Sequence, residues 1–147
     1  MIEVPALLWQ LDSLLPRVDF LSIGSNDLFQ FIFAVDRDSD RITRRYDTLA
    51  PAFLRVMKKI ARSCDNAKVP VTVCGEMAGR PLEALALLGL GYRRLSMTAA
   101  SIGPIKEAIM SANYHGITDF IDNALKNNGK HTRAALAGYA RDHGISV

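Results

Sequence analysis

The sequence predicts an α/β fold in which short parallel strands alternate with helices. Its 147 residues are 49% hydrophobic and 22% charged, which is the composition of a packed globular domain. Short apolar runs recur along the chain, and a stretch with helical character follows each of them. Such alternation indicates parallel strands joined by right-handed crossovers, and therefore a doubly wound sheet or a barrel.

Four apolar runs have the length and composition of buried parallel strands. They are Met1 to Val4, Phe20 to Ile23, Val69 to Val73 and Arg94 to Met97. Four strands form only half of a (β/α)8 barrel, which usually needs about 250 residues, and they leave two apolar sheet edges uncovered. We therefore expect either a missing first half or another chain to cover these edges.

Proline and glycine positions predict where the helices begin and end. Pro5, Pro51 and Pro81 each suit the first turn of a helix, and the glycines of Gly89-Leu90-Gly91 suit a left-handed helix end. The expected helices are Pro5 to Leu15, Pro51 to Cys64, Pro81 to Leu88, Ile102 to Ala112, Ile117 to Lys126 and Thr132 to Asp142. Another helix is expected to follow Gly24.

Charge and cysteine usage exclude several functions. The net charge is +3, and the densest basic group, Arg41, Arg44 and Arg45, has no interleaved aromatic residues, so nucleic-acid binding is not expected. No apolar run is long enough to cross a membrane. Cys64 and Cys74 lack the paired spacing of a zinc site, and their usage suits a reducing cytoplasm.

Polar residues that follow the apolar runs are the candidate site residues, since ligands of parallel α/β folds gather at the carboxyl ends of the strands. Glu3 and Asp27 are two carboxylates that could hold Mg²⁺. A solvated Glu3 and an Asp27 that caps its helix are the alternatives. Asn26 lies in a glycine turn suited to an anion, and Cys74 is either a reactive thiol or an inert core residue.

Arg37 is the remaining candidate. It follows the run Phe31 to Asp36, from which a guanidinium could fold back over the strand ends and clamp an oxyanion. As a single arginine in a polar loop it would otherwise be unremarkable.

Taken together, these segments resemble the phosphoenolpyruvate (PEP)-utilising enzymes. The run from Asp19 to Arg37, DFLSIGSNDLFQFIFAVDR, follows the long signature of that family throughout. The segments Met1 to Pro5, Cys74 to Gly79 and Leu95 to Met97 occur in the family's order. The form CGEMAG is most similar to Enzyme I of the bacterial phosphotransferase systems, and the C-terminal segment resembles its nitrogen-related branch.

The resemblance implies a fold and a domain organisation. Residues 1–147 would be the C-terminal part of the PEP-binding TIM-barrel domain, with four parallel βα units over about residues 1–100 and C-terminal helices over about 101–147. The phosphohistidine and carrier-binding domains would precede it and are absent from this chain. His115, His131 and His143 lie outside the family's phosphohistidine context. This chain alone is therefore expected to be inactive.

The resemblance also implies a reaction. The complete enzyme would move the phosphoryl group of PEP to its own histidine and then to a phosphocarrier protein, and would release pyruvate. Glu3 and Asp27 would bind Mg²⁺, Asn26, Asp27 and Arg37 would bind the substrate, and Cys74 would be the general acid. Glu76 is left out of the catalytic residues. A cytoplasmic homodimer is expected.

Two alternatives remain open from the sequence. The chain could belong to an enzyme similar to PEP synthase or to pyruvate phosphate dikinase. It could also be a binding or dimerisation module that holds PEP without turnover.

Overall fold

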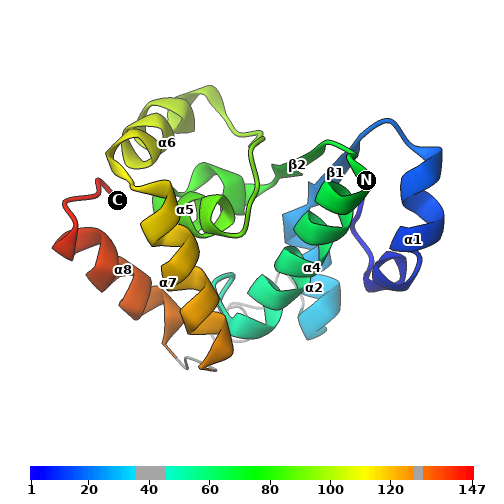
Figure 1. Cartoon of the computed structure of the whole chain (residues 1–147), viewed down its shortest axis with the longest axis horizontal. Helices are drawn as coiled ribbons and strands as arrows, with labels where there is room; N and C mark the ends of the chain where they lie inside the picture. The colour runs from blue at the N-terminus through cyan, green and yellow to red at the C-terminus, as the bar shows by residue number, and fades with distance from the viewer. Residues whose placement is uncertain (36–45, 128–130) are drawn as a thin grey trace.

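A computed structural model of the chain describes residues 1–35, 46–127 and 131–147. Arg37 and the basic group Arg41, Arg44 and Arg45 lie outside the described residues. In order along the chain the elements are η1 (Pro5–Trp9), α1 (Leu11–Leu14), η2 (Leu15–Arg17), β1 (Leu21–Gly24), α2 (Ser25–Phe33), α4 (Pro51–Ala67), β2 (Val71–Cys74), η3 (Glu76–Gly79), α5 (Pro81–Gly89), α6 (Ala99–Ser111), α7 (Tyr114–Lys126) and α8 (Thr132–Asp142), where η marks 3-10 helices. The predicted α/β class is confirmed, with helices in the majority (Figure 1).

A small parallel sheet carries the fold. β1 and β2 pair in parallel from Leu21 opposite Val71 to Gly24 opposite Cys74. An isolated parallel bridge joins Ile2 to Ile23 on one side, and another joins Leu95 to Val73 on the other. The neighbours in space therefore follow the order of the sequence, as in a sheet whose parallel strands are joined by successive crossovers.

The prediction of four regular strands was wrong for the two outer ones. Among the residues that the structure describes, Ile2 and Leu95 each form a single isolated bridge, and each outer segment has a strand partner on one side only. The backbone N–H and C=O groups on the other side of each outer segment therefore form no hydrogen bonds with a neighbouring strand of the described sheet. Phe20, predicted at the start of a buried strand, lies before β1 and is largely exposed.

The first predicted helix is also interrupted. Residues 5–17 form η1, α1 and η2 instead of one α-helix. The break falls at Gln10, whose backbone N–H donates to the carbonyl of Leu7 at 3.0 Å in the tighter 3-10 pattern. Leu8, Leu11 and Leu15 still reach the core, so the apolar face survives the interruption.

The remaining predicted helices all form, although α4 continues to Ala67, beyond its predicted end, and α6 and α7 begin at Ala99 and Tyr114, before their predicted starts. α4 and α5 begin at Pro51 and Pro81 as expected, and α8 has the predicted bounds. The residue with positive φ after α5 is Gly91, at 102°, while α5 itself ends at Gly89. Because proline and glycine act through the local backbone, these boundaries were readable from the sequence.

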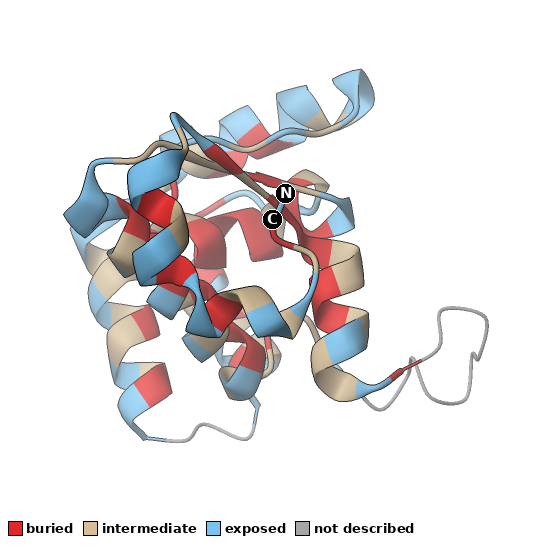
Figure 2. Cartoon of the chain, turned by 90° about the vertical axis from the view of Figure 1, so that its right-hand side faces the viewer, coloured by how far each residue is buried: buried red, intermediate tan, exposed pale blue. Residues whose placement is uncertain are grey.

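Helix α4 forms the centre of the core on one side of the sheet. Phe53, Leu54, Met57 and Ile60, spaced as on one helical face, are fully buried, and Tyr92 donates a hydrogen bond to the carbonyl of Met57 at 2.8 Å. Figure 2 shows the buried residues concentrated on the inward sides of the helices. None of the described helices is long and apolar enough to cross a membrane.

Helices α6, α7 and α8 gather around α5, on the left in Figure 1. Gly89 allows the close approach of α7, because a Cβ atom at this position would come within 2.8 Å of the side chains of Ile117 and Ile121. The C-terminal helices therefore form one body with the helix that follows β2.

An ion-pair cluster, made of Asp47, Glu83 and Arg133, fastens α8 to this body. Arg133 donates to Asp47 through Nε (2.9 Å) and Nη2 (2.8 Å), and through Nη2 to Glu83 Oε1 at 2.6 Å. Glu83, on α5, is only 2% exposed and also accepts from the hydroxyl of Thr48 at 3.3 Å. The hydrogen bonds and the charge of the two carboxylates raise the pKa of Arg133 despite its partial burial.

Candidate functional site

The ends of β1 and β2 lie side by side, and the candidate site is built on them. The register places Gly24 opposite Cys74. Ser25, buried at the start of α2, donates a hydrogen bond from its hydroxyl to the carbonyl of Cys74 at 2.6 Å. The turn that follows β2 is thus fixed against the start of the helix that follows β1.

Gly75 makes this close approach possible. Its φ is 98°, a conformation that favours glycine, and a Cβ atom there would lie 2.5 Å from Ser25 Oγ and 2.9 Å from Asn26 Oδ1. The next residue, Glu76, donates its backbone N–H to Asn26 Oδ1 at 3.1 Å. Asn26 is therefore held in place by the β2 turn, and its amide group faces the same region as that turn.

The two cysteines have different surroundings. Cys74 is half-buried at the end of the sheet, and its thiol donates to the carbonyl of Ile23 at 3.1 Å. Cys64 is fully buried within α4, and burial raises its pKa to about 11. The inert core thiol is therefore Cys64, while Cys74 is placed where a ligand can reach it.

Glu3 and Asp27 lie at the same end of β1. The Glu3 side chain covers Gly24, since a Cβ atom on that glycine would come within 2.7 Å of Glu3 Cγ and 2.9 Å of Oε1. Asp27 belongs to the first turn of α2, which starts directly after Gly24. Among the described residues there is no group of three or more His, Cys, Asp or Glu side chains that could hold a metal ion. These two carboxylates would thus need further ligands from substrate or water.

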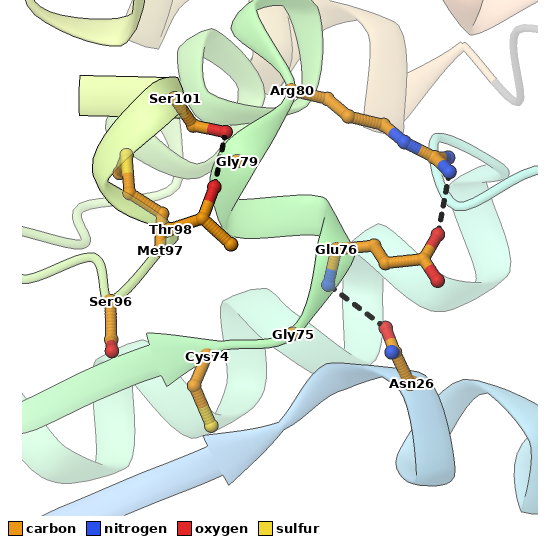
Figure 3. Close-up of a pocket in the computed structure, with 10 residues that line it drawn as sticks. All are labelled: Asn26, Cys74, Gly75, Glu76, Gly79, Arg80, Ser96, Met97, Thr98 and Ser101. Carbon is orange, nitrogen blue, oxygen red and sulfur yellow. Dashed lines mark hydrogen bonds and ion pairs between the residues drawn. The ribbon is translucent and has the colours of Figure 1, made fainter. Parts of the chain in front are cut away.

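An open pocket of about 620 Å³ lies beside these strand ends (Figure 3). Asn26 and Cys74 line it on one side, and the segment that follows the Leu95 bridge supplies hydroxyl groups on the other. The side chains of Thr98 and Ser101 hydrogen-bond each other at 3.2 Å. The complete lining is Asn26, Cys74, Gly75, Glu76, Gly79, Arg80, Ser96, Met97, Thr98 and Ser101.

Arg80 and Glu76 form the charged rim of the pocket. Arg80 Nη2 donates to Glu76 Oε2 at 2.6 Å, and both side chains remain exposed, at 54% and 68%. The second guanidinium nitrogen, Nη1, lies 3.9 Å from Glu83 Oε1. The rim therefore carries one cation shared between two carboxylates.

The structure brings some of the predicted site residues together. Asn26 and Cys74 line one pocket, and Glu3 and Asp27 lie at the adjoining end of β1 without being part of the lining. Arg37 falls outside the described residues. The roles of these residues in binding and catalysis stay predictions.

Of the other polar groups that line the pocket, sequence reasoning left Glu76 out of the catalytic residues and did not single out Arg80, Ser96, Thr98 or Ser101. Arg80 and Glu76 are four residues apart, a spacing typical of ion pairs on a helical turn, and this signal could have found them. Ser96 lies inside the fourth predicted apolar run and directly follows the Leu95 bridge, where the rule on strand ends places ligand contacts. Thr98 and Ser101 have no such signal, because they reach the pocket through the start of α6.

Comparison with known proteins shows to which family the chain is similar. Residues 1–114 match the model of the family described as PEP-utilising enzyme, PEP-binding domain. The match includes both strands, all the predicted site residues and the whole pocket lining, and it ends at the first residue of α7.

Several characterised proteins are similar to the chain. The Escherichia coli protein named phosphoenolpyruvate-dependent phosphotransferase system is 45% identical over 126 residues, which are 86% of this chain and 17% of the relative. A phosphoenolpyruvate-protein phosphotransferase of Cupriavidus necator is 39% identical over 142 residues, 96% of this chain and 24% of the relative. Multiphosphoryl transfer protein 2 of Escherichia coli is 41% identical over 125 residues, 85% of this chain and 15% of the relative. The chain thus spans about a quarter or less of these relatives.

Proposed function

The chain belongs to the PEP-utilising enzyme family, whose PEP-binding domain it carries, and from this premise we propose that it is part of a PEP-protein phosphotransferase. That enzyme would transfer the phosphoryl group of PEP to one of its histidines and then to a phosphocarrier protein. The observation that carries the proposal is the pocket in which Asn26 and Cys74, from neighbouring strand ends, lie together. The names of the similar proteins from Escherichia coli and Cupriavidus necator support it.

The pocket residues would bind PEP by its two acidic ends. The NH₂ group of Asn26, whose Oδ1 is held by the Glu76 backbone, would donate to a substrate oxygen. Asp27 and Arg37 complete the proposed substrate-binding residues, and the planar guanidinium of Arg37 suits a phosphate. Binding at both ends would orient the phosphoryl group for transfer to a histidine outside this chain.

Cys74 would supply the proton of the reaction. When the bond between phosphorus and the enol oxygen breaks, its electron pair stays with the enolate, and the methylene carbon must gain a proton to give pyruvate. The Cys74 thiol, which donates to the carbonyl of Ile23 in this structure, would donate to this carbon and then regain a proton from water. Delivery of this proton converts the enolate to pyruvate and so pulls the reaction forward.

Mg²⁺ would be the metal of this reaction, and Glu3 and Asp27 are the residues that would hold it. Both are oxygen ligands at the same end of β1, as a hard cation prefers. The bound ion would neutralise charge on the substrate oxygens. Glu3 and Asp27 would set the position of the ion. Gly24, which lacks a Cβ atom, allows the Glu3 side chain to lie against it.

The complete protein would contain this chain as one part of a larger barrel domain. The order of Ile2, β1, β2 and Leu95 across the sheet fits the C-terminal half of a (β/α)8 barrel, with barrel units to about residue 100 and C-terminal helices beyond. Preceding domains would carry the phosphohistidine and bind the phosphocarrier. We also propose that the protein forms a homodimer through this domain and that it is cytoplasmic.

A phosphoryl-transfer assay tests this function. The complete enzyme that contains this chain, given PEP labelled in its phosphoryl group, Mg²⁺ and a histidine phosphocarrier, is expected to label the carrier and to release pyruvate in equal amount. A requirement for a nucleotide would instead indicate an enzyme similar to PEP synthase or to pyruvate phosphate dikinase. Binding of PEP without transfer would contradict catalysis and leave a binding module.

A further inference from the structure

Arg80 is the one cation among the described residues that line the pocket, and no role follows for it from the family resemblance. Its charge is divided between Glu76, at 2.6 Å, and Glu83, at 3.9 Å. A ligand with two anionic ends enters a pocket whose only described charges are this arginine and Glu76. How firmly the two carboxylates hold Arg80 therefore decides whether it can meet the ligand.

Glu83 does not depend on Arg80. It is 2% exposed, and the guanidinium of Arg133 binds it at 2.6 Å while the hydroxyl of Thr48 donates to it at 3.3 Å. A buried carboxylate satisfied in this way does not need a second cation 3.9 Å away. Arg80 is therefore available on this side.

Glu76 holds Arg80 only at the surface. Both side chains are more than half exposed, and exposed pairs of this kind stabilise a protein little because water solvates both charges. The Glu76 backbone, by contrast, stays bonded to Asn26 whatever its side chain does. The pair can consequently open without disturbing the turn that shapes the pocket.

We propose that Arg80 is a further substrate-binding residue, which exchanges its contact with Glu76 for an oxyanion of the bound substrate. Glu76 acts as the competing anion that occupies the guanidinium when the pocket holds no ligand. Guanidinium groups bind carboxylate and phosphate oxygens in the same bidentate manner, so either end of PEP meets the requirement. This inference rests on the proposed function.

Substitutions of the two partners separate this role from a structural one. In the complete enzyme, Arg80→Ala is expected to weaken PEP binding about tenfold or more, because one charged hydrogen-bonding group is lost. Glu76→Gln is expected to strengthen PEP binding by up to about fivefold, because the competing charge is removed. If the ion pair only supported the structure of the pocket, both substitutions would instead weaken PEP binding.

Calorimetric titration measures these affinities, with Arg141→Ala as the matched control. Arg141 carries the same charge on the exposed side of α8, outside the pocket lining, and its replacement is expected to leave the affinity unchanged. Titration with pyruvate and with inorganic phosphate shows which end Arg80 meets, since only the ligand that carries that end loses affinity in Arg80→Ala.

Two results would overturn the inference, and they differ from failure of the proposed function. Equal PEP affinity in wild type and Arg80→Ala removes the role of Arg80 while PEP binding stands. Weaker binding in Glu76→Gln as well as in Arg80→Ala makes the pair structural. If the wild-type enzyme itself binds no PEP, the proposed function fails first. Arg80→Met, which keeps the aliphatic stem, replaces Arg80→Ala if the latter does not fold.

Discussion

Replacement of Cys74 with alanine is expected to lower the rate of pyruvate formation by about 10²-fold to 10⁴-fold, the usual contribution of a positioned general acid. The thiol lines the pocket, and its hydrogen-bonding contacts are with the carbonyl of Ile23 at 3.1 Å and with Met1 Sδ at 4.0 Å. The affinity for PEP should therefore change little. The measurement is pyruvate release by the complete enzyme at saturating PEP, compared with a binding titration.

Cys64→Ala is the matched control for this substitution. Cys64 has the same chemistry but is fully buried in α4, with its pKa raised to about 11 by burial. Its replacement is expected to reduce stability and to leave the rate of pyruvate formation per folded enzyme unchanged. A wild-type rate in Cys74→Ala would show that another group delivers the proton.

Replacement of Arg133 with alanine is expected to lower the free energy of unfolding of the chain by about 3 kcal/mol, because it leaves the carboxylate of Glu83 buried without its cation. Glu83 is 2% exposed, while the Arg133 side chain is 43% exposed, so we take the lower end of the range for a broken buried pair. Urea unfolding followed by circular dichroism measures this loss.

The double variant Arg133→Ala with Glu83→Gln provides the control. It removes the stranded charge together with its partner and is expected to recover a large part of the lost stability. If Arg133→Ala loses no more stability than the exposed Arg141→Ala, the ion-pair cluster does not stabilise the fold. A double variant as unstable as the sum of the single ones would contradict the coupling.

Acid should weaken the same cluster. Burial alone would raise the pKa of Asp47, but the hydrogen bonds from Arg133 and from the Leu49 backbone, with the charges of Arg133 and Arg80, lower it below its usual value. A lowered pKa in the folded state contributes stability above the unfolded pKa, and this contribution is lost as pH falls through the folded pKa. The acid-dependent loss of stability should therefore be smaller in Arg133→Ala than in wild type.

Much of the fold could be predicted because its signals are local. Pro51 and Pro81 start their helices, and the apolar runs around Leu21 and Val71 form the two regular strands. The break at Gln10 could not be predicted, since the apolar face of residues 5–15 continues across it. Whether the outer segments become strands depends on partners outside their own sequence.

The candidate site was predictable to a similar extent. Asn26 and Cys74 were found because the residues that follow parallel strands meet at one edge of the sheet. The cluster of Glu83 and Arg133 joins residues 50 positions apart, and no local pattern indicates such a contact. Arg80 became a candidate only when the structure placed it on the rim of the pocket.

The most direct test of a PEP site at the ends of β1 and β2 is calorimetric titration of PEP into the complete enzyme, with and without Mg²⁺, in wild type and Asp27→Ala. Asp19→Ala, which removes an exposed carboxylate before β1, is the control. We expect binding that depends on Mg²⁺ in wild type and Asp19→Ala, and its loss in Asp27→Ala. Binding by Asp27→Ala with unchanged affinity and metal dependence would contradict the proposed site.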